Sequence, residues 1–212
     1  MKSVNLLRTE DVFYVVVDGN SSDGTKDLLA EAGPLIDLWV SEPDEGIYDA
    51  MNKGVSLLPH EDGHVLFLGA GDRLLELPPY RQRERGAVLF GNVQIKNTAF
   101  LSSAGWKLKA GNTLHHQGLF VPRNILANWL FDTRYKIFAD FDLNQRLLRA
   151  NIPFKSLNST IAFAEPDGLS WNSSHSEMVA ISRKNFGLFW GCAARLWATY
   201  CALREHLLGK AW

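Results

Sequence analysis

Four aspartates stand at positions where carboxylate chemistry is expected. Asp18, Asp44 and Asp72 each come shortly after a run of branched or aromatic residues typical of a buried strand, and Asp140 opens a stretch with helical periodicity. Because ligands bind beyond the carboxyl ends of parallel strands, we expect the first three carboxylates to converge on one edge of a sheet. Carboxylates placed there can ligate a hard cation or accept a proton. The alternative, that each acid only caps a turn or a helix, stays open.

Strands and helices alternate along the first third of the chain. Strands are predicted over residues 13–17, 35–40 and 65–68, with helices between them over residues 25–32 and 47–58. Further strands are predicted over residues 87–95, 114–121 and 152–164, and helices directly after Pro122 and over residues 140–150. The alternation predicts an α/β fold with a Rossmann-like, mostly parallel central sheet flanked by helices.

The end of the chain differs in composition from the rest. We expect residues 1–170 to form one domain and residues 171–212 to form a helical, apolar tail. Three interpretations of the tail stay open: it packs on the domain, it lies in a membrane interface, or it forms a contact between copies of the chain. Tryptophan and tyrosine flanked by cations favour the interfacial helix. No apolar run is long enough to predict a transmembrane helix.

Charge and cysteine content exclude several classes of function. The 212 residues include 22 Lys and Arg against 23 Asp and Glu, for a formal net charge of -1. We therefore expect no nucleic-acid partner, and any anionic ligand must be held by a few placed groups or by a metal. Cys192 and Cys201 cannot form a disulfide framework, and residues 1–10 lack a signal-peptide pattern. These features favour a cytoplasmic protein.

Five segments, in order and at plausible spacing, resemble family 2 glycosyltransferases of the GT-A fold. They are residues 15–25 (VVVDGNSSDGT), 41–54 (SEPDEGIYDAMNKG), 66–72 (LFLGAGD), 116–117 (HQ) and 139–143 (ADFDL). The second of these closely resembles a segment of exopolysaccharide and colanic-acid-type transferases. The third stands in the place of the family's DxD-like metal motif, and the last two resemble its acceptor-side motifs. The resemblance implies a GT-A-like fold and sugar transfer.

Two departures from the family pattern stand out. The strand and loop with which the family begins are absent, so that residues 1–8 supply only a remnant of the helix that follows them. That strand belongs inside the sheet, and its loss is expected to expose an unpaired edge and apolar surface. Either the start is shortened, or another element covers the gap. In the metal motif, Gly69 and Gly71 leave Asp72 as the only carboxylate.

Glycosyl transfer from a nucleoside diphosphate requires charge neutralisation, proton removal and alignment of the two reactants. We expect Asp72 to supply one ligand to Mg²⁺ or Mn²⁺, which bridges phosphate oxygens. We expect Asp140, at a helix N-terminus, to act as the base. Direct displacement by a hydroxyl inverts the anomeric carbon, and the resemblance also implies inversion.

The remaining candidates surround these two acids. Asp18, Asp44, Tyr48, Asn52 and Lys53 are predicted to bind the nucleotide sugar, with Lys53 offsetting phosphate charge. The alternative for Lys53 is a solvated helix face. His116 and Asp142 are predicted on the acceptor or phosphate side. A structural role for His116, and a pair between Asp142 and Arg146 at helical spacing, stay open.

The predicted function is an inverting glycosyltransferase of surface polysaccharide biosynthesis, using a nucleotide-sugar donor and a saccharide or lipid-linked acceptor. The apolar tail suits an acceptor presented at the cytoplasmic membrane face. The alternative is a degenerate, non-catalytic GT-A domain that binds a nucleotide or a partner transferase. The missing strand and the sparse metal motif favour this alternative.

Overall fold

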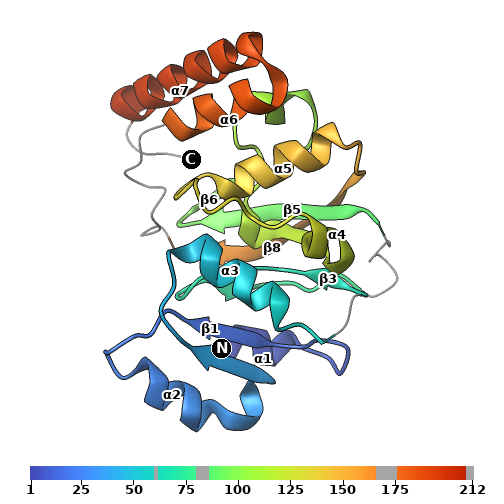
Figure 1. Cartoon of the computed structure of the whole chain (residues 1–212), viewed down its shortest axis with the longest axis vertical. Helices are drawn as coiled ribbons and strands as arrows, with labels where there is room; N and C mark the ends of the chain where they lie inside the picture. The colour runs from blue at the N-terminus through green and yellow to red at the C-terminus, as the bar shows by residue number, and fades with distance from the viewer. Residues whose placement is uncertain (60–61, 80–85, 166–175, 209–212) are drawn as a thin grey trace.

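The computed structural model describes residues 1–59, 62–79, 86–165 and 176–208. Figure 1 shows three parts stacked along the longest axis of the molecule: a small N-terminal sheet with helices α1 (Lys2–Leu7) and α2 (Thr25–Ala32) beside it, a larger central sheet, and two helices near the C-terminus, α6 (Ser176–Phe186) and α7 (Leu188–Leu208). The predicted boundary between residues 170 and 171 lies outside the described residues. The predicted helical tail is present as α6 and α7.

The N-terminal part has the predicted strand, helix, strand order. It consists of α1 (Lys2–Leu7), β1 (Val15–Asp18), α2 (Thr25–Ala32), the 3₁₀ turn η1 (Gly33–Leu35) and β2 (Leu38–Ser41). β1 and β2 pair in parallel, in register from Val15 opposite Leu38 to Asp18 opposite Ser41. Leu29 and Ala32 of α2 are buried against Val16 and Trp39 of this sheet. The crossover helix therefore packs back on its own strands, as expected for a parallel pair.

The larger sheet contains six short strands. They are β3 (His64–Val65), β4 (Arg73–Leu74), β5 (Val88–Ile95), β6 (Thr98–Phe100), β7 (Leu119–Pro122) and β8 (Phe154–Ala164), in the order β3-β7-β5-β8-β4 with β6 beside β5. The α/β class is confirmed, but the sheet is mixed where a mostly parallel one was expected. Among the described strands of this sheet, only β5 and β8 pair in parallel. The reason is that the chain returns from β5 to β7 without a crossover helix, which makes those strands antiparallel.

Among the described residues, no strand joins the two sheets. The predicted strand over residues 65–68 forms a ladder only at its first residue, and residues 66–68 run on without a strand partner. Val4 of α1 packs beside this segment, in a cluster with Leu66, Leu68 and Tyr14. The Ser3 hydroxyl oxygen also accepts a hydrogen bond from the Leu74 N–H at 3.1 Å. α1 thus covers apolar side chains at the position where the sheet is interrupted.

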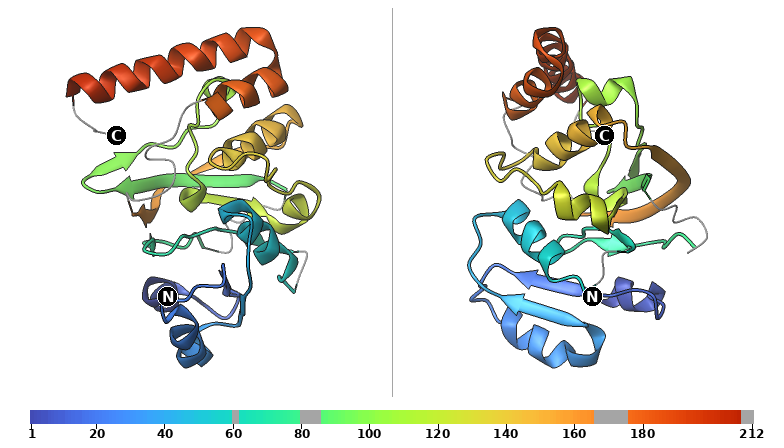
Figure 2. Two further views of the ribbon diagram at one scale, coloured as in Figure 1. Left: turned by 60° about the vertical axis from the view of Figure 1, so that its left-hand side comes forward. Right: turned by 45° about the vertical axis from the view of Figure 1, so that its right-hand side comes forward.

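The main core lies between the larger sheet and the helices that cover it. These helices are α3 (Ile47–Ser56), α4 (Arg123–Asn128), α5 (Ala139–Arg149) and α6. Phe141 and Leu147 of α5 are fully buried there, as is Ile181 of α6. Helix α6 therefore packs on the domain, which is one of the three interpretations of the tail given above. α7 packs on α6 and forms the outermost layer at that end of the molecule (Figure 2).

Candidate active site

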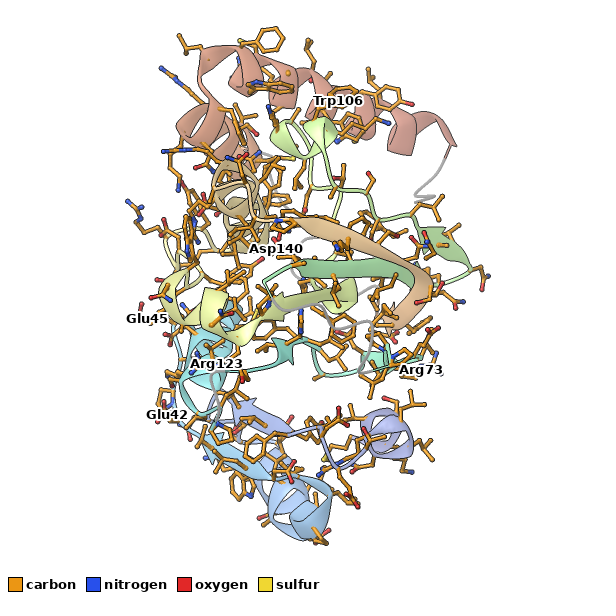
Figure 3. The ribbon with its side chains drawn as sticks, turned by 90° about the vertical axis from the view of Figure 1, so that its right-hand side faces the viewer. Glu42, Glu45, Arg73, Trp106, Arg123 and Asp140 are labelled. Atoms are coloured by element: carbon orange, nitrogen blue, oxygen red, sulfur yellow. The ribbon has the colours of Figure 1, made fainter. Side chains whose placement is uncertain are left out.

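Asp140 lies in the first turn of α5, near the middle of the molecule (Figure 3). Residues 139–145 and Leu147 are all buried, so the first two turns of this helix are enclosed on every side. The chain leading into it is held by Glu177 of α6. The Glu177 carboxylate accepts hydrogen bonds from the backbone N–H groups of residues 136, 137 and 138 at 3.0–3.1 Å. Helix α5 therefore begins at a defined position relative to the tail.

The Asp140 carboxylate collects donors from three separate segments. Its Oδ1 accepts from the Tyr48 hydroxyl at 3.1 Å and from the Phe141 N–H at 2.7 Å. Its Oδ2 lies 3.4 Å from the Asn112 side-chain nitrogen and 3.5 Å from Nδ1 of His116. Burial acts to raise the pKa of Asp140, but the hydrogen bond and charge of His116, with the Phe141 N–H, outweigh it and hold that pKa below its usual value. Asp140 is therefore ionised at neutral pH.

Asp72 closes the loop that follows β3. Its Oδ2 accepts from the Gly69 N–H at 2.6 Å and from Nε2 of Gln117 at 3.0 Å, and its Oδ1 accepts from the Glu165 N–H at 3.0 Å. Gly71 has a φ of +93°, a conformation that favours glycine. The carboxylate therefore holds its own loop, the turn before β7 and the end of β8 together. A carboxylate has about four acceptor positions, so one remains open on Oδ1.

A single turn brings Asp72 and Asp140 to the same region. This turn, η4 (His116–Gly118), precedes β7. The side chain of Gln117 contacts Asp72, while His116 contacts Asp140. Consecutive residues of one turn thus link the metal-motif acid to the helix acid, and a shared cleft between the two carboxylates stays a prediction.

The two remaining acids occupy neighbouring loops on the N-terminal sheet. Asp44 Oδ2 lies 2.5 Å from the position of a Cβ built on Gly19, so the loops after β1 and β2 touch. Asp18 accepts from the hydroxyls of Ser21 and Ser41, each at 2.6 Å, and these bonds hold the pKa of Asp18 below its usual value. The loop of Asp44 leads directly into α3, which carries Tyr48 to Asp140. The acidic loops and the Asp140 cluster are thus connected through one helix.

The chain resembles known glycosyltransferases in both sequence and structure. It is 30% identical over 150 residues to a PGL/p-HBAD biosynthesis glycosyltransferase of Mycobacterium bovis (strain BCG / Pasteur 1173P2), a match covering 64% of this chain and 58% of that protein. It is 40% identical over 75 residues to an uncharacterized glycosyltransferase of Mycobacterium tuberculosis (strain ATCC 25618 / H37Rv), covering 34% of this chain and 28% of that one. The chain thus spans 58% or less of these curated relatives. No protein-family model matches it.

Solved structures extend the resemblance to nearly the whole chain. S. aureus TarS 1-349 in complex with UDP superposes with a TM-score of 0.62 at 14% identity, covering 98% of this chain and 66% of that one. The mannosyltransferase PcManGT from Pyrobaculum calidifontis, in complex with GDP-Man and Mn²⁺, gives a TM-score of 0.58 at 14% identity, covering 97% and 70%. The chain has a GT-A-like glycosyltransferase fold.

Within this GT-A-like fold, three predicted nucleotide-binding residues have structural partners. The single hydrogen of the Tyr48 hydroxyl is shared between the Ile137 carbonyl at 2.6 Å and the Asp140 carboxylate at 3.1 Å. The Asn52 side chain exchanges two hydrogen bonds of 3.0 Å with the Phe131 backbone. Tyr48 and Asn52 point into the interior because their helix uses that face to pack on the domain. These contacts position the site, and a contact of Tyr48 or Asn52 with the nucleotide stays a prediction.

Lys53 differs from the prediction. Its ammonium lies 3.1 Å from Glu42, 3.3 Å from Asp49 and 2.7 Å from the Pro43 carbonyl. Two carboxylates already neutralise this cation, so it is not available to offset phosphate charge. Its contacts instead fix the loop that carries Asp44.

Asp142 faces away from Asp140 although both lie in the first turn of α5. It is fully buried, and its oxygens lie 2.8 Å from Arg146, 2.7 Å from Lys184 and 3.1 Å from the Asn185 amide. Positions two apart on a helix point in different directions, which explains the separation. The predicted acceptor-side role of Asp142 is corrected, and the alternative pair with Arg146 is confirmed.

Several polar side chains near Asp140 were not predicted. Asn144 is fully buried, lines a small, mostly apolar recess together with His116 and Asp140, and has no hydrogen-bond partner among the described residues. Burial and the neighbouring charge of His116 lower the pKa of His115 to about 4, so this imidazole is neutral. The sequence carried one usable signal: Asn144 is four positions after Asp140 and so shares its side of the helix. Unpaired buried polar atoms call for a partner, so this recess next to Asp140 is a candidate binding site.

A divalent cation fits this site only together with a phosphate ligand. Among the described residues, no three His, Cys, Asp or Glu side chains cluster as a metal site. Asp72 has one acceptor position left after its three N–H bonds. Mg²⁺ and Mn²⁺ accept such sparse protein ligation when phosphates and water complete the shell. The donor set thus suits a cation that arrives with a diphosphate.

Proposed function

We propose that the chain is an inverting glycosyltransferase that moves a sugar from a nucleotide-sugar donor to a saccharide or lipid-linked acceptor. The observation that carries the proposal is that the η4 turn contacts both acids in a GT-A-like fold, the ionised Asp140 through His116 and Asp72 through Gln117. The names of the curated relatives, and the UDP and GDP-Man bound to two structural neighbours, support a nucleotide-sugar donor. The resemblance to family 2 and colanic-acid-type transferases supports a role in surface polysaccharide biosynthesis in the cytoplasm.

Asp140 serves as the base in this proposal. Its ionised state leaves it ready to accept the proton of an acceptor hydroxyl, and the surrounding N–H and O–H donors keep the carboxylate in one orientation. A depressed pKa makes a weak base, so exclusion of water by the bound sugars is needed to strengthen it. With Asp140 as the base, direct attack by the acceptor hydroxyl from the face opposite the leaving group inverts the anomeric carbon.

Asp72 holds the donor's diphosphate through a divalent cation in the same scheme. Mg²⁺ or Mn²⁺, when bound, acts as a Lewis acid that stabilises the charge developing on the leaving diphosphate. Gly71, at a φ of +93°, allows the backbone to approach the phosphates closely. Asp18 and Asp44 remain the proposed contacts for the nucleoside. Their loops adjoin helix α3, which carries Tyr48 to the Asp140 carboxylate.

The test compares Asp140→Asn with Asp132→Asn, a change of the same kind at a surface ion pair. Release of UDP or GDP from a panel of nucleotide sugars is measured with Mn²⁺, and nucleoside diphosphate binding is measured by calorimetry. Asp140→Asn is expected to lower turnover by about 10²–10⁴-fold, the usual contribution of a positioned base, with binding unchanged. Near-normal turnover in Asp140→Asn would refute the assignment.

A non-catalytic domain that binds a nucleotide is the second candidate. The interruption between β1 and β3, and the single open acceptor position on Asp72, favour it. Nucleoside diphosphate binding without turnover of any sugar in the panel, in the wild-type chain, would support this candidate over the enzyme.

A further inference from the structure

Helix α7 exposes its large apolar side chains and buries its small ones. Phe189, Leu196, Tyr200 and Leu203 are 56–74% exposed, and their spacings of seven, four and three residues place them on one side of the helix. The opposite side packs against α6 through Gly191 and Ala194, both buried. An ordinary surface helix shows the reverse arrangement. The outward side of α7 is therefore an apolar stripe that lacks a partner within the described residues.

Aromatic rings and cations extend this stripe onto a neighbouring turn. The turn η3 (Trp106–Lys109) lies beside α7, and Trp106 is 68% exposed (Figure 3). The Lys109 ammonium lies 5.2 Å from the Phe186 ring centroid and 5.3 Å from that of Trp190. Such pairs of an aromatic ring and a cation at the edge of an apolar surface are typical of the lipid headgroup region.

The charged side chains that the structure describes on this surface all have one sign. Residues 101–111 and 186–203 contain the cations Lys107, Lys109 and Arg195 and no aspartate or glutamate, although the whole chain has a net charge of -1. Two copies meeting through this surface would bring cations together with no acid from either segment to neutralise them. An anionic surface, in contrast, complements them.

We propose that α7 and the η3 turn dock on an anionic lipid bilayer, with α7 lying in the plane of the headgroups. Phe189, Leu196, Tyr200 and Leu203 enter the outer acyl region, while Lys107 and Arg195 contact anionic headgroups. No helix among the described residues has the length and apolar composition to cross a membrane. The proposed contact is a peripheral one. Two attractive interactions act together in it, insertion of apolar side chains and attraction of basic side chains to anionic headgroups, as stable anchoring requires.

The docking surface borders the site of the proposed reaction. A Cβ on Gly111 would lie 2.6 Å from Nε1 of Trp197 on α7, so this glycine lets the helix approach. The next residue, Asn112, contacts Asp140 at 3.4 Å. If the proposed function holds, docking places the base close to the bilayer, where the acceptor would be a lipid-linked saccharide. The docking itself does not depend on that function.

Vesicle co-sedimentation tests the docking without donor or acceptor. The chain is mixed with phosphatidylcholine vesicles that either contain or lack phosphatidylglycerol. A double variant, Phe189→Ser with Leu196→Ser, removes apolar side chains that are exposed, so its melting temperature serves as the check on folding. The matched control is Leu28→Ser, at a residue that is 59% exposed on α2 at the other end of the molecule.

We expect binding to phosphatidylglycerol vesicles, weakened at least about tenfold by the double variant and unchanged by Leu28→Ser. Lys107→Glu with Arg195→Glu is expected to weaken binding by about tenfold or more at low salt, with a smaller effect at high salt. Absence of binding, or binding that the double variant leaves intact, would overturn the proposal. Sedimentation velocity supplies the remaining outcome: dimers that the double variant dissociates, without vesicle binding, would show a contact between copies instead. Because no sugar is present, failure here leaves the proposed glycosyl transfer untouched.

Discussion

The Tyr48 hydroxyl and the Asp140 carboxylate meet at 3.1 Å although the two residues are 92 positions apart. The single hydrogen of this hydroxyl is shared with the Ile137 carbonyl at 2.6 Å, so one side chain of α3 holds both the start of α5 and its functional acid. Burial and the charge of Asp140 raise the pKa of Tyr48, which keeps the phenol protonated as a donor. Tyr48 is therefore a positioning residue for Asp140.

Replacing Tyr48 with phenylalanine tests this relationship. The change strands the buried Ile137 carbonyl and removes one donor from ionised Asp140, so we expect the free energy of unfolding to fall by about 1–3 kcal/mol. The pKa of Asp140 is expected to rise, moving the acidic limb of the pH profile of turnover to higher pH. Urea unfolding and kcat measured against pH check the two effects. Tyr200→Phe, which removes a hydroxyl from an exposed ring, is the control, and an unshifted profile in Tyr48→Phe would contradict the positioning role.

Asp142→Asn is expected to destabilise the fold without direct loss of a catalytic group. The change leaves Arg146 and Lys184 without their buried anion, but the two cations keep 23% and 37% of their side-chain surface exposed and can partly turn to water. The expected loss is therefore about 1–3 kcal/mol, below that of a fully buried pair. Asp132→Asn removes the acid that pairs with the exposed Arg134 and lies 3.8 Å from Lys184; because Arg134 stays in water and Lys184 keeps Asp142, it should cost about 1 kcal/mol or less. Equal unfolding midpoints for the two variants would argue against the buried network.

Acid should destabilise the protein through His115. Burial lowers the pKa of this imidazole to about 4, whereas the unfolded chain titrates at its ordinary value of 6.5. Between these values the unfolded state binds more protons, so stability falls as pH falls from about 6.5 to 4. The loss is on the order of 3 kcal/mol. Unfolding free energies measured across this range should decline in the wild type and stay flatter in His115→Phe, which keeps an aromatic ring beside Phe100; parallel curves would count against the assignment.

Cation binding should depend on the nucleotide. Because Asp72 offers one open acceptor position and the described residues contain no metal cluster, Mn²⁺ alone is expected to give weak or undetectable heat in calorimetry. Adding UDP or GDP supplies phosphate oxygens and should produce binding that Asp72→Asn weakens by at least about tenfold. Tight binding of Mn²⁺ without a nucleotide would instead indicate a complete protein site that the described side chains do not form.

Local pattern predicted most elements of this fold. The helix over residues 25–32 has the predicted bounds, and the helix predicted over residues 140–150 is present as α5, shifted by one residue. Periodic apolar residues determine such elements because each buries one continuous face. A position of Asp72 and Asp140 beside one another was also predicted, and the η4 turn links the two acids.

The pairing of strands and the partners of polar side chains were harder to predict. Strands β5 and β7 pair antiparallel. Whether two strands pair in parallel or antiparallel depends on the path of the chain between them, and that path leaves no periodic pattern in the sequence. Asn52 reaches the backbone of Phe131 across 79 positions, and Asp142 meets Lys184 on a helix that packs only in the folded state. Asp142 lies in a segment that resembles the family and was therefore predicted to contact a ligand. In the structure this side chain is buried and its partners are other residues of the chain.

The contacts between α5 and α6 have a mechanical consequence. Glu177 of α6 binds the backbone just before Asp140, and Lys184 and Asn185 of the same helix bind Asp142 just after it. The reacting acid is thereby clamped from both sides by a helix on which α7 rests. If α7 docks on a bilayer as proposed, a tilt of α7 would reach the Asp140 carboxylate through these bonds, because the same helix that carries α7 holds the start of α5.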